Sequence, residues 1–154
     1  MEQNMDLPYR QGVQAYIFND KNEILVVCNA NDANFWKMPS GGIDIGETSE
    51  ETLHREVMEE LGIKVRIIKK SKHKNKFDWP KEIKIKTGNK YRGQEQEVFI
   101  TKIERNQNIK PDFYEISDYK WVYFKDVNKI LKLEHQQITT KKIIQEYRDL
   151  TNIS

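Results

Sequence analysis

The sequence predicts an α/β domain, and two features of its 154 residues support that prediction. Short β-rich runs recur along the chain, and two other segments place apolar residues at helical spacing. Strands that alternate with helices are typical of an α/β architecture, in which helices cover a sheet. The chain has no internal repeat, no low-complexity tract and no linker rich in Pro, Gly or Ser, so we expect a single domain at 1–154.

The first two strands are expected to form a hairpin. Val13 to Phe18 and Glu23 to Cys28 are both β-rich, and Asn19-Asp20-Lys21-Asn22 between them is a cluster of turn-forming residues. Because both runs are largely apolar, we expect the hairpin to have a buried face.

An amphipathic helix is predicted from Thr48 to Leu61. Thr48 and Glu51 have the spacing of a capping box, and Gly62 follows the last apolar residue of the pattern. The apolar residues at helical spacing are Leu53, Val57, Met58 and Leu61.

Three further strands and a second helix complete the expected elements. We expect strands at 64–68, 97–103 and 119–124. A terminal helix is expected from about Thr139, with one apolar face formed by Ile143, Ile144, Tyr147 and Leu150.

Composition excludes several classes of protein. Hydrophobic residues make up 37% of the chain and charged residues 32%, a mixture that can fill a core and argues against intrinsic disorder. No apolar run approaches the roughly 18 residues that a membrane-spanning helix needs, and the polar start resembles no signal peptide. A single cysteine, Cys28, excludes an internal disulfide framework, so we expect a reducing, cytoplasmic setting and no membrane partner.

The net charge of +2 conceals two blocks of opposite sign. Residues 47–60 hold six glutamates and one arginine, whereas 64–92 hold twelve Lys or Arg and two acids. An acidic cluster suits cations, and a basic surface suits phosphates. Together they indicate an enzyme that handles metal and phosphate, although the lysines could also form an ordinary solvated loop. We expect no DNA partner.

The predicted helix places three carboxylates on one face. Glu56, Glu59 and Glu60 stand at i, i+3 and i+4, where like charges repel by about 0.2–0.5 kcal/mol per pair. A divalent cation among them would remove that cost, because Mg²⁺ takes hard oxygen ligands and is usually shared with substrate phosphates. The alternative is a solvated acidic helix face without a ligand.

The segment from Gly41 to Ile63 resembles the signature of the Nudix hydrolases, G-x5-E-x7-R-E-U-x-E-E-x-G-U with U aliphatic, at every position. Trp36-Lys37-Met38-Pro39 before it is similar to the W-x-x-P approach usual in that family. The resemblance implies a Nudix fold, an α/β/α sandwich with a mixed β-sheet. It also implies hydrolysis of a nucleoside diphosphate linked to a further group.

The same resemblance implies roles for individual residues. Glu56, Glu59 and Glu60 are expected to ligate two or more Mg²⁺ or Mn²⁺ ions, helped by a main-chain carbonyl near Ser40 or Gly41. Such ions neutralise phosphate charge and lower the pKa of an attacking water, so no protein nucleophile is needed. We include Arg55 among the catalytic residues. Arg55 and Glu47 are expected to orient the site rather than to react.

Fragments outside the signature are similar to one branch of the family. Tyr9-Arg10 followed by Val13, Phe77-Asp78-Trp79-Pro80 and Gly93-Gln94-Glu95-Gln96 resemble elements of asymmetric diadenosine tetraphosphate hydrolases and bacterial RNA pyrophosphohydrolases. In that branch an acid ahead of a W/Y-x-W/F strand joins the metal site or activates water. Glu115 fits that position, with Asp112 as the competitor and an ordinary surface acid as the alternative.

The substrate contacts that we expect lie on both sides of the signature. Aromatic side chains could stack a nucleobase or simply pack, and basic side chains could bind polyphosphate or an RNA backbone. The candidates are Arg10, Lys76, Phe77, Trp79, Lys81, Lys90, Tyr91, Arg92 and Gln94. Two departures from the RNA pyrophosphohydrolases, Cys28-Asn29 in place of an arginine and Glu134-His135-Gln136 in place of a Phe-Lys pair, put base or RNA contacts there in doubt.

The resulting hypothesis is a metal-dependent hydrolase that cuts diadenosine tetraphosphate into ATP and AMP, or removes pyrophosphate from 5′-triphosphate RNA. A second hypothesis is a nucleoside triphosphate pyrophosphatase that cleans the nucleotide pool. A third is a Nudix module that binds nucleotide or RNA without cutting it, against which the intact Glu56, Glu59 and Glu60 argue.

Overall fold

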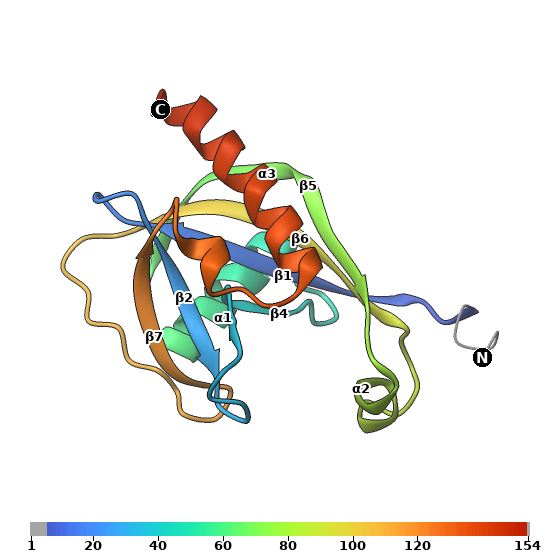
Figure 1. Ribbon diagram of the computed structural model, residues 1–154. Coiled ribbons are helices and arrows are strands. Elements are labelled where there is room, and N and C mark those ends of the chain that lie inside the picture. The colour runs from blue at the N-terminus through green and yellow to red at the C-terminus, as the bar shows by residue number, and fades with distance from the viewer. Residues whose placement is uncertain (1–5, 154) are drawn as a thin grey trace.

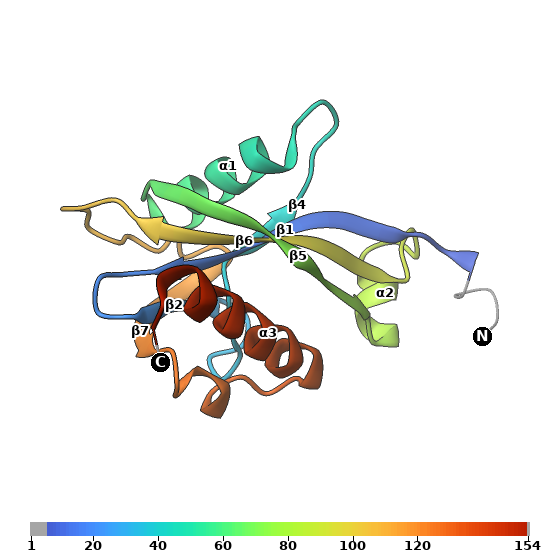
Figure 2. The ribbon, with the colours of Figure 1, turned by 90° about the horizontal axis from the view of Figure 1, so that it is seen from above.

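The chain folds into an α/β/α sandwich, as the sequence predicted. The computed structural model describes residues 6–153. A seven-stranded mixed sheet separates helix α1 (Ser49–Leu61) on one face from helix α3 (Glu134–Thr151) on the other (Figures 1 and 2). Each face of the sheet therefore has its own hydrophobic core.

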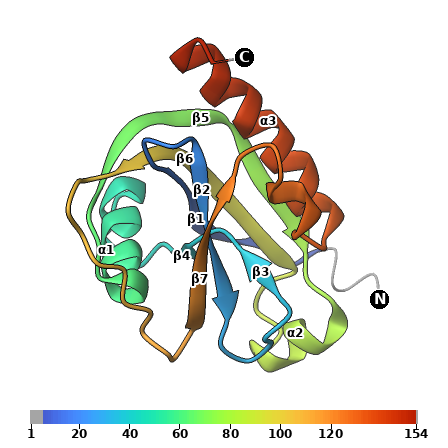
Figure 3. The ribbon, with the colours of Figure 1, turned by 60° about the vertical axis from the view of Figure 1, so that its left-hand side comes forward.

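The sheet has the strand order β3-β2-β1-β6-β5, with β4 attached to β1 and β7 to β2. Its strands are β1 (Tyr9–Phe18), β2 (Glu23–Asn29), β3 (Trp36–Lys37), β4 (Ser40–Gly42), β5 (Val65–Asp78), β6 (Gly93–Ile103) and β7 (Ile116–Tyr123). β1 runs parallel to β6 over its whole length, and the other pairs are antiparallel. Figure 3 shows β7 and β2 beside each other, away from the edge that β5 forms.

The expected hairpin of the first two strands is present only at its turn. β1 and β2 are antiparallel and pair at Phe18 and Ile24, with Asn22 in the left-handed region at φ 59°. Farther from the turn β1 pairs with β4 at 12–14 instead. Both strands are buried on both faces rather than on one, because helices cover the sheet from both sides.

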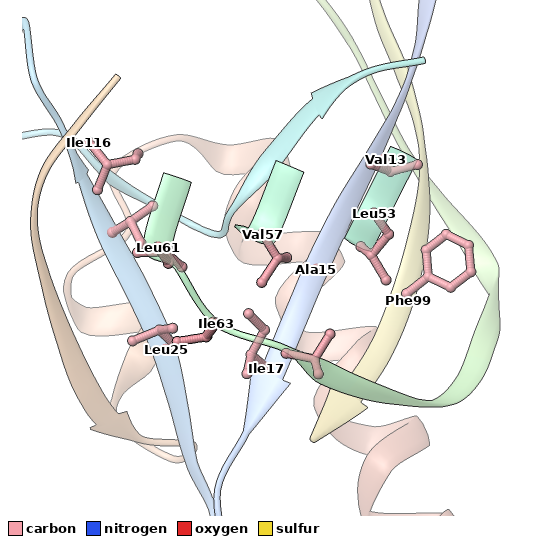
Figure 4. Close-up of a cluster of buried hydrophobic side chains, with 12 residues drawn as sticks. Val13, Ala15, Ile17, Leu25, Leu53, Val57, Leu61, Ile63, Phe99 and Ile116 are labelled. Atoms are coloured by element: carbon pink, nitrogen blue, oxygen red, sulfur yellow. The ribbon is translucent and has the colours of Figure 1, made fainter. Parts of the chain in front are cut away.

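Helix α1 has the boundaries that its sequence signals predicted. The Thr48 hydroxyl accepts from the Glu51 amide at 3.1 Å and the Glu51 carboxylate accepts from the Thr48 amide at 2.9 Å. Gly62 ends the helix with φ 66°. Its buried face packs on the sheet in a cluster (Figure 4) that includes Leu53, Val57, Leu61, Val13, Ile17 and Phe99.

Helix α3 is longer than expected. It begins at Glu134 rather than near Thr139, and the Gln136 side chain accepts from the Leu133 amide at 3.1 Å at its start. Ile143 and Tyr147 are buried in the second core, but Leu150, expected on the same face, is exposed, because it lines a surface hollow with Lys69 and His73 of the edge strand β5.

The expected strands at 64–68 and 97–103 belong to two longer strands that pair with each other as an antiparallel ladder. β5 continues to Asp78 and β6 begins at Gly93, with the short helix α2 (Lys81–Lys86) between them. The sequence did not predict the extra length of β5, because the segment from Lys69 to Lys76 lacks the alternation of apolar and polar residues that marks a strand. Charged side chains are common on edge strands such as β5, where they discourage pairing with other chains.

The chain was expected to carry no anchor. No helix within residues 6–153 is long and apolar enough to cross a membrane. Residues 1–5, part of the polar start on which that expectation rested, lie outside the described residues.

Replacing Leu61 by Ala is expected to lower the free energy of unfolding by about 2–5 kcal/mol, because the change leaves a cavity between α1 and the sheet. Leu61 is 0% exposed, whereas Met58 on the same helix is 43% exposed. Met58→Ala is the matched control and is expected to stay within about 0.5 kcal/mol. Urea denaturation measures both, and equal losses would contradict this packing of α1.

Candidate active site

Three carboxylates converge where α1 approaches the loop before β7. Glu56 and Glu60 come from α1, and Glu115 comes from the residue just ahead of β7. Each offers an oxygen, and these oxygens all lie within 4.8 Å of one another. Three oxygen donors this close together suit a hard divalent cation.

Glu60 is the most unusual member of this cluster. Its side chain occupies the buried face of α1 beside Val57 and Leu61, and the residue is only 1% exposed. Neither carboxylate oxygen has a hydrogen-bond partner among the described residues. Burial raises the pKa of Glu60 to about 9, against the lowering effect of the Lys37 ammonium, and Glu56 and Glu115 raise it further. A buried carboxylate without a partner fits a cation ligand, since an unpaired buried charge is otherwise very costly.

Gly41 forms the wall against which Glu56 lies. A Cβ at Gly41 would overlap the carboxylate group of Glu56. The missing side chain therefore lets the β4 backbone approach the carboxylate cluster closely. Burial raises the pKa of Glu56 as well, despite the neighbouring Arg55.

Arg55 ties the loop before α1 to the helix. Its guanidinium forms two hydrogen bonds with Glu47, from Nε at 2.6 Å and from Nη2 at 2.9 Å, and a third with Glu56 at 3.0 Å. The Arg55 hydrogen bond holds the pKa of the Glu47 carboxyl at about 2. Glu47 in turn raises the pKa of Arg55, so the pair stays ionised. This geometry suits the orienting role that was expected of both residues.

Glu115 is held in place by Asp112. One carboxylate oxygen of Asp112 accepts from the amides of Tyr114, Glu115 and Ile116 at 3.0–3.1 Å. The Asp112 amide donates to the Glu60 carbonyl at 2.9 Å, which attaches the loop to the end of α1. Of the two acids considered from the sequence, Glu115 lies in the carboxylate cluster and Asp112 organises its loop.

Glu59 lies outside the cluster. Its side chain is 56% exposed and contacts the Arg55 guanidinium at 3.3 Å. The expected convergence of three glutamates on one helix face is therefore met by Glu56 and Glu60, with Glu115 from another segment as the third member.

The expected substrate contacts fall into separate groups. Arg10 covers Gly42, where a Cβ would overlap its guanidinium, and the Gln94 amide covers Gly12. The Phe77 ring stacks on His135, with centroids 4.0 Å apart. Lys76 lies over the Tyr9 ring at 4.6 Å.

The remaining candidates lie around the end of the long β5–β6 ladder. The Trp79 amide donates to the Arg92 carbonyl at 2.9 Å, and Arg92 pairs with Asp78 at 2.8 Å. Lys81 and Lys90 are exposed, and Tyr91 is half-buried. Within residues 6–153, no hydrogen bond or ion pair joins Lys76, Trp79 or Lys81 to the carboxylate cluster.

Two residues were missed in the sequence, one beside the carboxylate cluster and one on the other face of the sheet. Lys37 acts electrostatically on Glu60 although it comes from β3, and its place in Trp36-Lys37-Met38-Pro39 was the only available signal. Gln14 on β1 is buried with an unpartnered carbonyl oxygen. A glutamine inside an apolar strand run was the signal there, since buried amides normally have partners.

Together, the sandwich fold and the carboxylate cluster define an α/β protein with an acidic site suited to a divalent cation. The sequence model described as the NUDIX domain matches residues 8–146. The chain belongs to the Nudix hydrolase family.

Similar proteins agree with this assignment. The chain is 35% identical over 136 residues to an RNA pyrophosphohydrolase of Pelagibacter ubique, covering 84% of this chain and 86% of that one. It is 33% identical over 159 residues to an RNA pyrophosphohydrolase of Bartonella henselae, covering 92% and 91%.

Solved structures share the fold at lower sequence identity. The E. coli dihydroneopterin triphosphate pyrophosphohydrolase matches with a TM-score of 0.72 at 16% identity, over 90% of this chain and 99% of that one. A C. elegans Ap4A hydrolase binary complex matches with a TM-score of 0.69 at 16% identity, over 90% and 98%.

Gly41→Ala is expected to reduce divalent-cation binding and turnover at least tenfold, because the added Cβ displaces the Glu56 carboxylate. Gly46→Asn is the matched control on the neighbouring loop. Gly46 has φ 87° with open space around it, a conformation that Asn tolerates better than most residues. Calorimetric titration with Mn²⁺ and steady-state kinetics measure both variants, and normal Mn²⁺ binding by Gly41→Ala would refute the proposed contact.

The stability of the metal-free protein is expected to fall as pH rises from 7 to 9. Because the pKa of Glu60 is raised from 4.5 to about 9, the folded protein keeps a proton that the unfolded chain releases, so rising pH favours unfolding. Added Mg²⁺ is expected to restore the Tm most strongly at pH 9, and Glu60→Gln is expected to abolish the slope. Burial lowers the pKa of His135 below 6.5, so His135 stays neutral throughout. Calorimetric melting in EDTA measures the slope, and a flat wild-type profile would contradict it.

Proposed function

We propose that this Nudix hydrolase acts on the 5′-triphosphate end of RNA, releasing pyrophosphate and leaving a 5′-monophosphate. The observation that carries the hydrolytic part is the buried, unpartnered Glu60 carboxylate within 4.8 Å of Glu56 and Glu115. Two relatives named RNA pyrophosphohydrolase, at 35% and 33% identity over most of the chain, support the choice of RNA. We also propose that residues 1–154 act as one catalytic domain.

In this proposal Glu56, Glu60 and Glu115 hold Mg²⁺ or Mn²⁺, with the β4 backbone at Gly41 beside them. Two or more such ions would neutralise the phosphates and lower the pKa of an attacking water. We include Glu59 in the ligand set as well, and its exposed side chain, which contacts Arg55 at 3.3 Å, would turn from Arg55 toward a second ion.

The residues around the carboxylates position the substrate. Arg55 holds the Glu56 carboxylate in place through the 3.0 Å hydrogen bond, and Arg10 brings a positive charge over Gly42, the neighbour of Gly41 on β4. The lysines of the β5–β6 ladder and α2, including Lys76 and Lys81, provide positive charge for the RNA backbone. Phe77, Trp79 and Tyr91 offer aromatic faces for a base.

Diadenosine tetraphosphate is the second candidate substrate. The fragments at Tyr9-Arg10, Phe77 to Pro80 and Gly93 to Gln96 are shared by both activities of the branch, so they favour neither. The Ap4A hydrolase neighbour, at 16% identity, supports the fold alone. A cytoplasmic place of action, where RNA is available, fits the single free cysteine, Cys28.

A competition assay tests the proposal. Equimolar 5′-triphosphate RNA and diadenosine tetraphosphate are offered to the same enzyme with Mg²⁺, and the products are separated by chromatography. We expect conversion of the RNA to its monophosphate first, with pyrophosphate as the second product. Rapid formation of ATP and AMP with the RNA untouched would make the protein a dinucleoside polyphosphatase instead.

Glutamine variants connect the activity to the carboxylates. Glu60→Gln and Glu59→Gln are both expected to abolish turnover while the circular dichroism spectrum stays unchanged, because a neutral amide is a poor ligand for a hard cation. Glu50→Gln on the exposed first turn of α1 is the control and is expected to retain full activity. A Glu59→Gln variant with most of its activity would remove Glu59 from the ligand set.

A further inference from the structure

Gln14 is a buried amide whose carbonyl oxygen has no partner. The residue lies in the middle of β1 and is 5% exposed, and among the described residues nothing donates to its Oε1. Buried polar atoms in folded proteins are almost always hydrogen-bonded, and each exception requires a reason. An acceptor that finds no donor within the chain can find one on a ligand.

Gln14 belongs to the α3 side of the sheet. Alternate residues of a strand point to opposite faces, and Val13 and Ala15 lie in the core under α1. Tyr16 lies in the core under α3, so Gln14, two residues before it, faces the same way. Its side chain is therefore on the opposite face from Glu56.

A stripe of other amides lies beside Gln14. A Cβ on Gly12, two residues away on the same face, would meet the Gln94 amide nitrogen at 3.0 Å and Gln96 Cγ at 3.6 Å. The Asn75 amide donates to Gln96 Oε1 at 2.8 Å, and Asn75 Oδ1 accepts from the Thr139 hydroxyl at 3.1 Å. These amides satisfy one another across β6, β5 and α3, whereas the Gln14 carbonyl is left over.

The stripe runs from β4, whose opposite face lies against the carboxylate cluster, to an aromatic pair. Gln14 pairs in register with Ser40, and Val13 pairs with Gly41, the residue that lies against Glu56. At the other end, Asn75 Oδ1 lies 3.3 Å from the His135 imidazole, which stacks on Phe77. Among the described strands β4 pairs with β1 alone, so a nucleotide with its phosphates at the carboxylates would cross the other edge of β4 to place its base along this stripe.

We propose that Gln14 determines base specificity by accepting a hydrogen bond from an exocyclic amine of the nucleobase. The inference rests on the proposed function, because it takes the phosphate position from the carboxylate cluster. A carbonyl oxygen can only accept, so it favours a base that presents an amine to it, as adenine, guanine or cytosine can, over the same base without that amine. The stripe is made of neutral amides, which suits an uncharged base rather than an ammonium group.

Two pairs of substrates, in each of which the bases differ by one amine, test this assignment. The first pair is triphosphate RNA that begins with adenosine or with purine riboside, and the second begins with guanosine or inosine. We expect wild-type kcat/KM to favour the amine about tenfold in at least one pair, because the analogue leaves the buried carbonyl unpaired. The ribose is constant within each pair, so a Gln14 contact to a sugar hydroxyl would give no preference in either pair. Equal kcat/KM values in both pairs would therefore overturn the proposal.

Gln14→Met supplies the second measurement, since it keeps the volume and removes the acceptor. We expect the amine preference to fall to about one while the Tm rises, because an unpartnered buried amide opposes folding. Gln96→Met is the matched control for stability and is expected to lower the Tm, since Gln96 loses its bond with Asn75. A Gln14→Met variant with lower Tm and an unchanged amine preference would assign Gln14 a structural role instead.

Binding separates this inference from the proposed function. Calorimetry compares AMP with purine riboside monophosphate, neither of which carries a phosphoanhydride to be cut. If no RNA is hydrolysed but AMP binds about tenfold more tightly, the proposed function fails and the role of Gln14 stands. If RNA is hydrolysed but neither assay shows an amine preference, the role of Gln14 fails and the proposed function stands.

Discussion

A carboxyl group on the core-facing side of α1 is the constraint on which the arrangement of the site depends. Glu60 shares its helix face with Leu53, Val57 and Leu61, so it is desolvated by the same packing that holds the helix on the sheet. Burial on that face brings Glu56 and Glu115 near it and raises its pKa. The packing that stabilises α1 therefore also imposes the free-energy cost of a buried acid. A cation bound to Glu60 would offset that cost.

The two faces of β1 carry side chains toward two different kinds of surroundings. β1 pairs with β4 at 12–14 and with β2 only at Phe18 and Ile24, while its other edge pairs continuously with β6. Odd-numbered positions here face α1 and the carboxylates, and even-numbered positions face α3 and the neutral amides. Charge for phosphate chemistry and neutral hydrogen-bonding groups for a base thus come from successive residues of one strand.

The signature segment was predictable because its signals are local. The capping box of Thr48 and Glu51, the apolar spacing of α1 and the stop at Gly62 depend only on neighbouring residues, and all three are present. The full length of β5 was not, since an edge strand of lysines and polar residues shows no alternation. The charged neighbours of Glu60 were only partly predictable, because tertiary folding brings Lys37 from β3 and Glu115 from the loop before β7.

The stacking of Phe77 on His135 shows how a departure from the family pattern changes what the site can bind. His135 stands in the segment where RNA pyrophosphohydrolases usually carry a Phe-Lys pair, and the extra turns at the start of α3 bring it onto the sheet. One face of the Phe77 ring is then covered by the imidazole at 4.0 Å. A base that stacks on Phe77 must use the opposite face or displace His135. Because His135 also contacts Asn75 at 3.3 Å, displacement would disturb the amide stripe, so the uncovered face is the less costly choice.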